Sequence, residues 1–419
     1  MFFLSSNIGR VRDLLAGCSI SLLVFFIPYS TALVNLFSAI CLVCWLGSGF
    51  VLDDLKKFYH SVVGKILLVF LFISFLSILW SEAPKEYILD GFAKLRKFIL
   101  LAVVWMLLAR LREFQKLTLC SMFLSFSLLT LICLGIYAGV PGFPNMTPGQ
   151  GAIFLRSHIA QGYFLSLLVC VCAAILCLTR GYKTRLLGLT FLILSMIVTL
   201  YMTNGRTGYV CLVCSLLVMA ITVPGSIKKK LLLLVFTGAV ISTTIISSER
   251  LEKRWEDAVV DMQKLEAGNG ETSIGYRLRA VKASFDMVKE RPWLGAGLGS
   301  WGMKFCQFDS INKQNLALCQ KTINVGNPHS DYLNWLSQFG IPGLILWLAF
   351  LFCLWKRCFR LDKRYRAFVM AALASYMVGS LFNSFMWDIS EGTASALMFG
   401  WILAVSTRIE EKGTKQLEI

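Results

Sequence analysis

Apolar runs of about 20 residues recur along the chain, and each is long enough to cross a bilayer as an α-helix. Backbone polar groups in lipid must be satisfied internally, so only helices or closed barrels can span a membrane. Continuous runs such as residues 231–246, LLLLVFTGAVISTTII, do not alternate as barrel strands do. The sequence therefore predicts an all-α, polytopic transmembrane helical bundle of about twelve helices. The predicted spans are residues 14–29, 32–51, 63–80, 93–109, 117–138, 153–178, 186–203, 207–223, 231–247, 331–355, 367–385 and 392–408.

Charged residues are too scarce to coat a soluble protein of this size. They make up 16% of the 419 residues, whereas soluble domains average about 25%, and 57% of the chain is hydrophobic. The first apolar run follows Arg10 and Arg12, and no small-residue cleavage site comes after it. We therefore expect this run to be retained as the first span and not removed as a signal peptide.

The net charge of +17 is distributed by side of the membrane. Connections placed alternately on two sides form a basic set, including DDLKK, RLREFQK, RGYKTR and SIKKK, and a set almost free of positive charge, including IPYST and MWDIS. The positive-inside rule places the basic set and both termini in the cytoplasm. Membrane lipids are therefore expected partners of the basic loops, and nucleic acid is not.

One connection on the non-cytoplasmic side is far longer than the others. Residues 249–328 are predicted to form a largely helical periplasmic loop between N-terminal spans in residues 1–248 and C-terminal spans with a cytoplasmic tail in residues 329–419. Cys306 and Cys319 lie in this loop. In an oxidising compartment they could form a disulfide, and two free thiols are the alternative.

Three arginines are candidate phosphate ligands on this side. Arg206 lies in NGRTG, a short turn between apolar spans, where a charge is costly unless it is functional or snorkels to headgroups. Arg277 and Arg279 follow in the long loop. Guanidinium groups grip phosphate oxygens bidentately, although either loop arginine alone could belong to a solvated helix face.

His329 is a candidate general base. It stands in GNPHSDY, where the chain re-enters the membrane. Its imidazole could take a proton from a hydroxyl near neutral pH, and Asp331 and Tyr332 could orient it. The alternative is a purely structural hydrogen bond near a helix N-terminus. Further polar residues at this edge could bind substrate or serve structure alone: Asn327, Tyr332, Asn383, Asp388, Glu391, Arg156, His158 and Gln161.

The chain lacks the motifs of several other enzyme classes. No DxD carboxylate pair for a divalent metal occurs on the outer side, and no Walker A or Gly-x-Ser-x-Gly element occurs. The sequence therefore predicts a site without metal or other cofactor, in which arginines neutralise a leaving diphosphate.

The C-terminal half resembles the O-antigen ligase and O-antigen polymerase superfamily. GNPHSDYLNWLSQFGIPGLILW after a long outer loop carries the resemblance, together with TNGRTGY and with GYRLRAVKASFDMVKERPWLGAGLGSW, which is similar to an arginine-containing helix followed by a Pro-x-x-Gly-x-Gly turn. The likeness runs from Tyr201 to Gly392. The family has a Trp about four residues after its loop arginine, where this chain has Val281, so the choice between Arg277 and Arg279 stays open, with Arg277 preferred.

This resemblance implies a GT-C-like O-antigen ligase in the inner membrane of a Gram-negative bacterium, active at the periplasmic face in lipopolysaccharide biosynthesis. It would transfer a glycan from undecaprenyl diphosphate to the lipid A core without metal or ATP. Arg206 and the pair Arg277 and Arg279 would hold the diphosphate. His329 would activate the acceptor hydroxyl for a single inverting displacement.

Two other functions compete with this interpretation. A polymerase or a protein O-oligosaccharyltransferase would keep the fold and change the acceptor, and the compact chain favours the ligase. A flippase or transporter for a lipid-linked sugar would predict internal repeats and broken helices near the midplane. No convincing repeat is present, and the polar residues gather at the outer edge instead.

Overall fold

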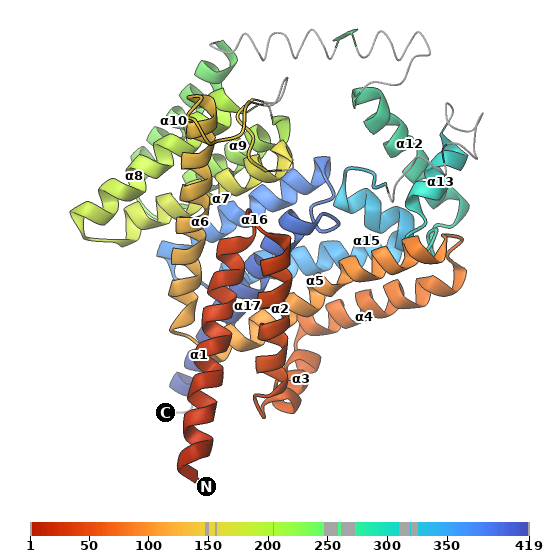
Figure 1. Cartoon of the computed structure of the whole chain (residues 1–419), viewed down its shortest axis with the longest axis horizontal. Helices are drawn as coiled ribbons and strands as arrows, with labels where there is room; N and C mark the ends of the chain where they lie inside the picture. The colour runs from red at the N-terminus through yellow and green to blue at the C-terminus, as the bar shows by residue number, and fades with distance from the viewer. Residues whose placement is uncertain are drawn as a thin grey trace.

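The computed structural model is all-helical over the residues that it describes, namely 2–146, 151–155, 157–203, 205–246, 259–260, 273–309, 319 and 326–417 (Figure 1). No strand occurs among these residues; an isolated bridge joins Gly151 and Thr203. The N-terminal half contains α1 (Phe2–Phe26), α2 (Thr31–Leu46), α3 (Val51–His60), α4 (Val62–Leu76), η1 (Ser77–Trp80), α5 (Lys85–Arg110), α6 (Phe114–Tyr137), α7 (His158–Leu178), α8 (Tyr182–Ile197) and a π-helical turn, η2 (Val198–Met202). The remainder contains α9 (Arg206–Thr222), α10 (Ile227–Ile246), α12 (Ser273–Glu290), α13 (Trp301–Phe308), α15 (Asp331–Cys358), α16 (Lys363–Phe382) and α17 (Ile389–Leu417).

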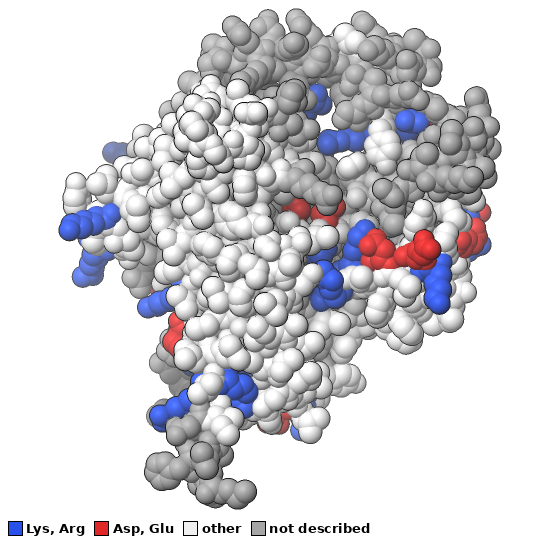
Figure 2. All heavy atoms as spheres, viewed as in Figure 1, with Lys and Arg blue, Asp and Glu red and all other residues white. Residues whose placement is uncertain are grey.

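Every predicted span overlaps a helix, and the structure supports a helical membrane protein. By length and composition, seven helices among the described residues could cross a bilayer. The number rises to eight if α2 and α3, which are bent by 99° at their junction, count as one span. α9 is apolar but has only 17 residues. Twelve spans therefore remain a prediction. In Figure 2, residues other than Lys, Arg, Asp and Glu form most of the described part of the visible face.

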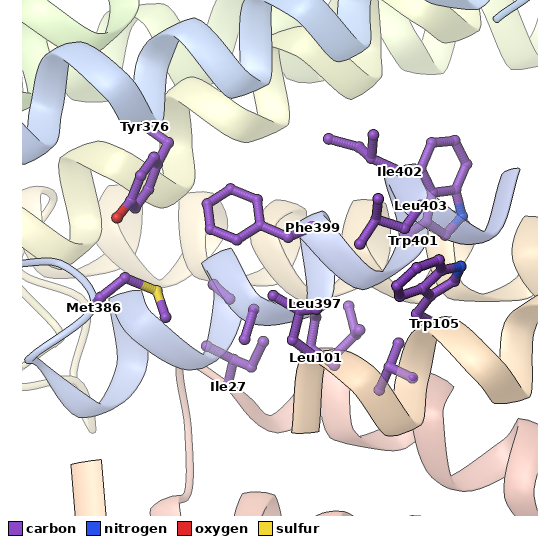
Figure 3. Packing of buried hydrophobic residues seen from close by; sticks show 14 of the residues in the cluster. Ile27, Leu101, Trp105, Tyr376, Met386, Leu397, Phe399, Trp401, Ile402 and Leu403 are labelled. Atoms are coloured by element: carbon purple, nitrogen blue, oxygen red, sulfur yellow. The ribbon is translucent and has the colours of Figure 1, made fainter. Parts of the chain in front are cut away.

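Aromatic side chains fill the core where α4, α5, α15, α16 and α17 meet. Phe70 contacts Trp335 edge-on, with ring centroids 5.2 Å apart, and Trp335 stacks on Phe339 at 5.8 Å. Phe399 of α17 points toward Tyr376 of α16, and their centroids are 4.9 Å apart (Figure 3). Offset and edge-to-face pairs of this kind add about 0.5–1.5 kcal/mol each beyond burial.

Glycine permits a close crossing between α7 and α9. A Cβ atom on Gly162 would lie 2.6 Å from Gly208 Cα, and a Cβ on Gly208 would lie 2.8 Å from Gly162 Cα. Helices in membranes associate through such small residues because lipid supplies no hydrophobic drive between them. The crossing fixes the start of α9, which carries Arg206, against the start of α7.

A break in α15 receives the turn that follows α12. Gly340 has φ of 68° and interrupts the helix just before Pro342, so backbone carbonyls near it lack helical partners. The N–H of Ala296 donates to Ser337 O at 2.8 Å, and the N–H of Gly297 donates to Gln338 O at 2.9 Å. The Pro-x-x-Gly-x-Gly stretch is therefore bonded into α15.

A small hydrophobic cluster holds α12 and α13 together, and a disulfide joins α13 to the chain that follows it. Ala280, Ala283 and Met287 of α12 are buried against Trp301 and Phe305 of α13. Cys306 at the end of α13 is joined to Cys319 by a disulfide. The predicted helical loop is thus, in its described part, a packed cap beside α15.

Candidate active site

His329 lies at a bend that its neighbours impose. Its φ is 51°, the only positive φ of a residue other than glycine in the described chain. Asn327 Oδ1 accepts a hydrogen bond from the His329 N–H at 2.9 Å, and Ser330 caps α15 by accepting from the Leu333 N–H. Tyr276 of α12 contacts the imidazole edge-on, with centroids 5.6 Å apart. A positive φ in a residue other than glycine is strained, and such residues cluster at functional sites.

Arg277 and Arg206 share this neighbourhood. Burial lowers the pKa of His329 below its ordinary value, and the nearby charge of Arg277 lowers it further. The pKa of Arg277 is in turn lowered by burial and by the charge of Arg206. These residues come from α9, α12 and the approach to α15, so the fold gathers three separate motifs. Within the described part of the chain, neither Arg206 nor Arg277 has a carboxylate partner.

Arg279 faces a different environment. Its Nη1 donates to Asp309 Oδ2 at 2.6 Å, and the side chains are 13% and 1% exposed. Two helical positions separate Arg279 from Arg277, so their side chains point about 200° apart around α12. Arg279 therefore fastens α12 to the end of α13, while Arg277 lies toward His329.

The start of α9 is held by buried polar contacts. Asn383 Nδ2 donates to Thr207 Oγ1 at 2.7 Å, and both residues are buried. A Cβ on Gly205 would lie 3.1 Å from His158 O, so the first turns of α7 and α9 touch. Asn383 thus links α9 to the connection between α16 and α17, and His158 lies beside the Arg206 turn. Arg156 lies outside the described residues.

The prediction that Asp331 and Tyr332 orient His329 is wrong. Asp331 is fully buried and accepts from Tyr376 Oη at 2.6 Å and from the Met386 N–H at 3.1 Å. Tyr332 donates its hydroxyl to Met377 O at 2.9 Å. The first turn of α15 directs both side chains into the bundle, where they bind α16 and the turn after it.

The family comparison covers the residues of this site. The family described as O-antigen ligase matches residues 191–348. Over these residues the chain is similar to the O-antigen ligase family. The family comprises glycosyltransferase-like membrane enzymes. The matched residues include Arg206, Arg277, Arg279 and His329, the residues gathered around the cap. A search of curated proteins finds no match to the chain.

A buried lysine outside the residues that match the O-antigen ligase family was missed by sequence reasoning. Lys97 of α5 is 2% exposed, and its Nζ donates to Met386 O at 2.7 Å and to Asp388 O at 2.6 Å. Asp331 accepts a hydrogen bond from the N–H of Met386, so Lys97 and Asp331 both bind the backbone of one turn. The signal was available, because a lysine within an apolar span is costly and has a partner when it persists.

The remaining predicted substrate ligands are mostly used within the fold. Gln161 donates to Ala152 O at 2.9 Å and accepts from the Phe154 N–H at 3.0 Å, which favours a structural role. Glu391 is buried at the start of α17, and burial raises the pKa of the neighbouring Asp388 carboxyl. Among the described residues no three His, Cys, Asp or Glu side chains are grouped as metal ligands. Metal independence is a prediction from the motifs.

Proposed function

We propose that this chain is an O-antigen ligase with about twelve spans in a bacterial inner membrane, acting at the periplasmic face with both termini in the cytoplasm. It would transfer a glycan from undecaprenyl diphosphate to a sugar of the lipid A core. The observation that carries the proposal is the meeting of Arg206, Arg277 and His329. The match of residues 191–348 to a family of glycosyltransferase-like membrane enzymes also supports the proposal.

The proposed reaction is one displacement at the anomeric carbon. The oxygen of an acceptor hydroxyl forms the new glycosidic bond as the bond from the anomeric carbon to the diphosphate oxygen breaks. The hydroxyl proton passes to the His329 imidazole, and the electron pair leaves with the undecaprenyl diphosphate. Attack from the face opposite the leaving group inverts the anomeric configuration.

The electrostatics suit this division of roles. A lowered pKa keeps the His329 imidazole neutral near pH 7, as a base requires. Arg206 and Arg277 would stabilise the charge that develops on the leaving diphosphate, and preorganised cations in a partly dry site are effective at this. Their mutual repulsion in the free protein would be relieved by a diphosphate. No cofactor is required for these steps.

A reconstituted reaction tests the function. The purified chain would receive a glycan on undecaprenyl diphosphate together with two acceptors, lipid A core and excess donor. Ligation gives lipid A core carrying one glycan, even when a chelator is present. Products that grow by repeat units on the lipid carrier would identify a polymerase, and movement of intact donor between leaflets without new glycosidic bonds would identify a transporter.

A further inference from the structure

A groove of about 400 Å³ lies between α2, α5 and α17, in a part of the molecule that takes no part in the proposed transfer. Two contacts fix the course of its walls. Arg96 Nη2 donates to Asn35 Oδ1 at 3.0 Å, and Arg110 Nη1 donates to Ser48 Oγ at 3.4 Å farther along both helices. α2 and α5 therefore run side by side in the same direction.

The lining of the groove changes from polar to apolar along that direction. The Arg96 end is lined by Val34, Asn35, Ser38, Arg96, Lys97 and Thr393, of which all but Val34 are polar. One to two helical turns farther on, the lining consists of Ala39, Leu42, Ile99, Leu100 and Val103. These residues recur every three to four positions, so each set forms one continuous face of its helix. The groove thus has the polarity profile of an amphiphile.

The polar end is positively charged. No carboxylate lines the groove, and Lys97 has its Nζ turned to the carbonyl groups of Met386 and Asp388. Arg96 is exposed, and within the described residues its side chain makes the one hydrogen bond to Asn35 and no ion pair. Most of its N–H donors are therefore open to an anion, and a guanidinium group suits phosphate oxygens.

We propose that this groove binds a phospholipid of the surrounding bilayer, with its phosphate on Arg96 and an acyl chain along Leu42, Ile99 and Val103. A net anionic headgroup, as in phosphatidylglycerol, matches the uncompensated charge. A soluble anion would leave the apolar half unused, and an apolar helix of another protein would leave Arg96 without a partner. The site is separate from the diphosphate site, because its lining includes neither His329 nor the arginines beside it.

Lipid binding to the full-length, delipidated protein tests this inference. Phosphatidylglycerol would be titrated in detergent while retained lipid is counted by native mass spectrometry and thermal unfolding is followed. Diacylglycerol with the same chains and inorganic phosphate are the two comparison ligands. We expect phosphatidylglycerol alone to raise the unfolding temperature at low concentration, since only it fills both ends of the groove.

Two variants and two controls sharpen the result. Arg96→Gln should weaken phosphatidylglycerol about tenfold, the effect of one charge-assisted hydrogen bond, and the matched exposed variant Arg185→Gln on α8 should not. Leu42→Trp should fill the apolar half and also weaken the lipid. Since Arg96 is exposed, Arg96→Gln should unfold at the normal temperature without lipid. His329→Ala should bind the lipid normally, so failure of the transfer mechanism would leave this measurement intact.

Three outcomes would overturn the proposal. Equal affinity of Arg96→Gln and Arg185→Gln for phosphatidylglycerol would remove the headgroup contact. An equal shift with inorganic phosphate would indicate a site for free anions. Diacylglycerol binding as tightly as phosphatidylglycerol would reduce the groove to an apolar surface without recognition of charge.

Discussion

Two regions with buried or half-buried charge use their polar atoms in opposite ways. At the turn of residues 386–388, Lys97 donates hydrogen bonds to backbone carbonyl groups of the turn, and Asp331 accepts one from a backbone N–H. Around His329, the charge of Arg277 acts on the imidazole and the charge of Arg206 acts on Arg277. Within the described residues, no carboxylate is paired with either arginine. The first region has its polar atoms hydrogen-bonded within the fold, whereas the second holds neighbouring like charges that have no carboxylate partner among the described residues.

This comparison separates structural charges from charges kept for a ligand. A buried charge with its hydrogen bonds made fixes a conformation, and removing one partner costs stability. A cluster of like charges lowers the stability of the free protein, and binding a ligand of opposite charge offsets that repulsion. Arg279 is paired with Asp309 and belongs to the first kind, and our proposal places Arg277, two residues away, in the second.

The largest expected effect is on catalysis. His329→Ala should lower the rate of glycan transfer by about 10²–10⁴-fold, the usual contribution of a general base, with donor binding nearly unchanged. Single-turnover transfer and donor binding would be measured separately. The control is His60→Ala, an exposed histidine on α3. A variant that still transfers at a near-normal rate would exclude His329 as the base.

Loss of the hydrogen bonds that Lys97 donates to Met386 and Asp388 should lower stability before it affects catalysis. Lys97→Met would leave the Met386 and Asp388 carbonyl groups without their donor and Asp331 without a nearby cation. We expect the free energy of unfolding to fall by about 3–5 kcal/mol. Thermal unfolding in detergent measures this. Lys85→Met, at an exposed position on the same helix, should change little. Equal unfolding temperatures for the two variants would mean that the turn does not depend on Lys97.

The two loop arginines should divide by type of defect. Arg277→Gln should lower transfer by about 10²–10³-fold, as removal of one transition-state donor does, with normal unfolding. Arg279→Gln should instead destabilise the cap, because it leaves the buried Asp309 carboxylate without its cation. Transfer rate and unfolding temperature would be measured for both. The reverse pattern would exchange their roles.

The smallest expected effect is on the pH profile. In the native protein, kcat/KM should fall as pH drops through a His329 pKa that lies below 6.5, because protonation removes the base. In Arg277→Gln the pKa of His329 should rise, since a neighbouring positive charge is gone. The residual activity should therefore fall off at a higher pH than in the native protein. The shift should be small, because burial lowers the pKa of His329 more than the charge of Arg277 does. An unchanged limb would place Arg277 too far away to affect the imidazole.

The sequence was informative where periodicity and composition decide the outcome. Each apolar run that was predicted to be a span overlaps a helix of the structure. A run of this length in lipid can satisfy its backbone polar groups only as a helix or within a closed barrel. Local patterns do not report which helices meet, so the insertion of residues 296 and 297 into the break of α15 could not be read from the Pro-x-x-Gly-x-Gly spacing. The broken α15 itself had a local signal in Gly340 and Pro342.

Side-chain roles were predictable only in part. The arginine and histidine motifs were identified because charged groups stand out at the edge of apolar spans. Asp331 was misassigned because its distance from His329 along the chain says nothing about the direction of its side chain in the first turn of α15. Lys97 was overlooked because its partners are backbone carbonyl groups almost 300 positions away, which no sequence pattern specifies.

The bonding of the cap into α15 has a consequence for unfolding. Four backbone N–H groups, those of Ala296, Gly297, Gly299 and Ile341, donate across this junction. A loop is normally among the first parts of a protein to exchange its amide hydrogens. Here these amides should exchange as slowly as the interior of the membrane helix, and loop and helix should come apart together as one cooperative unit.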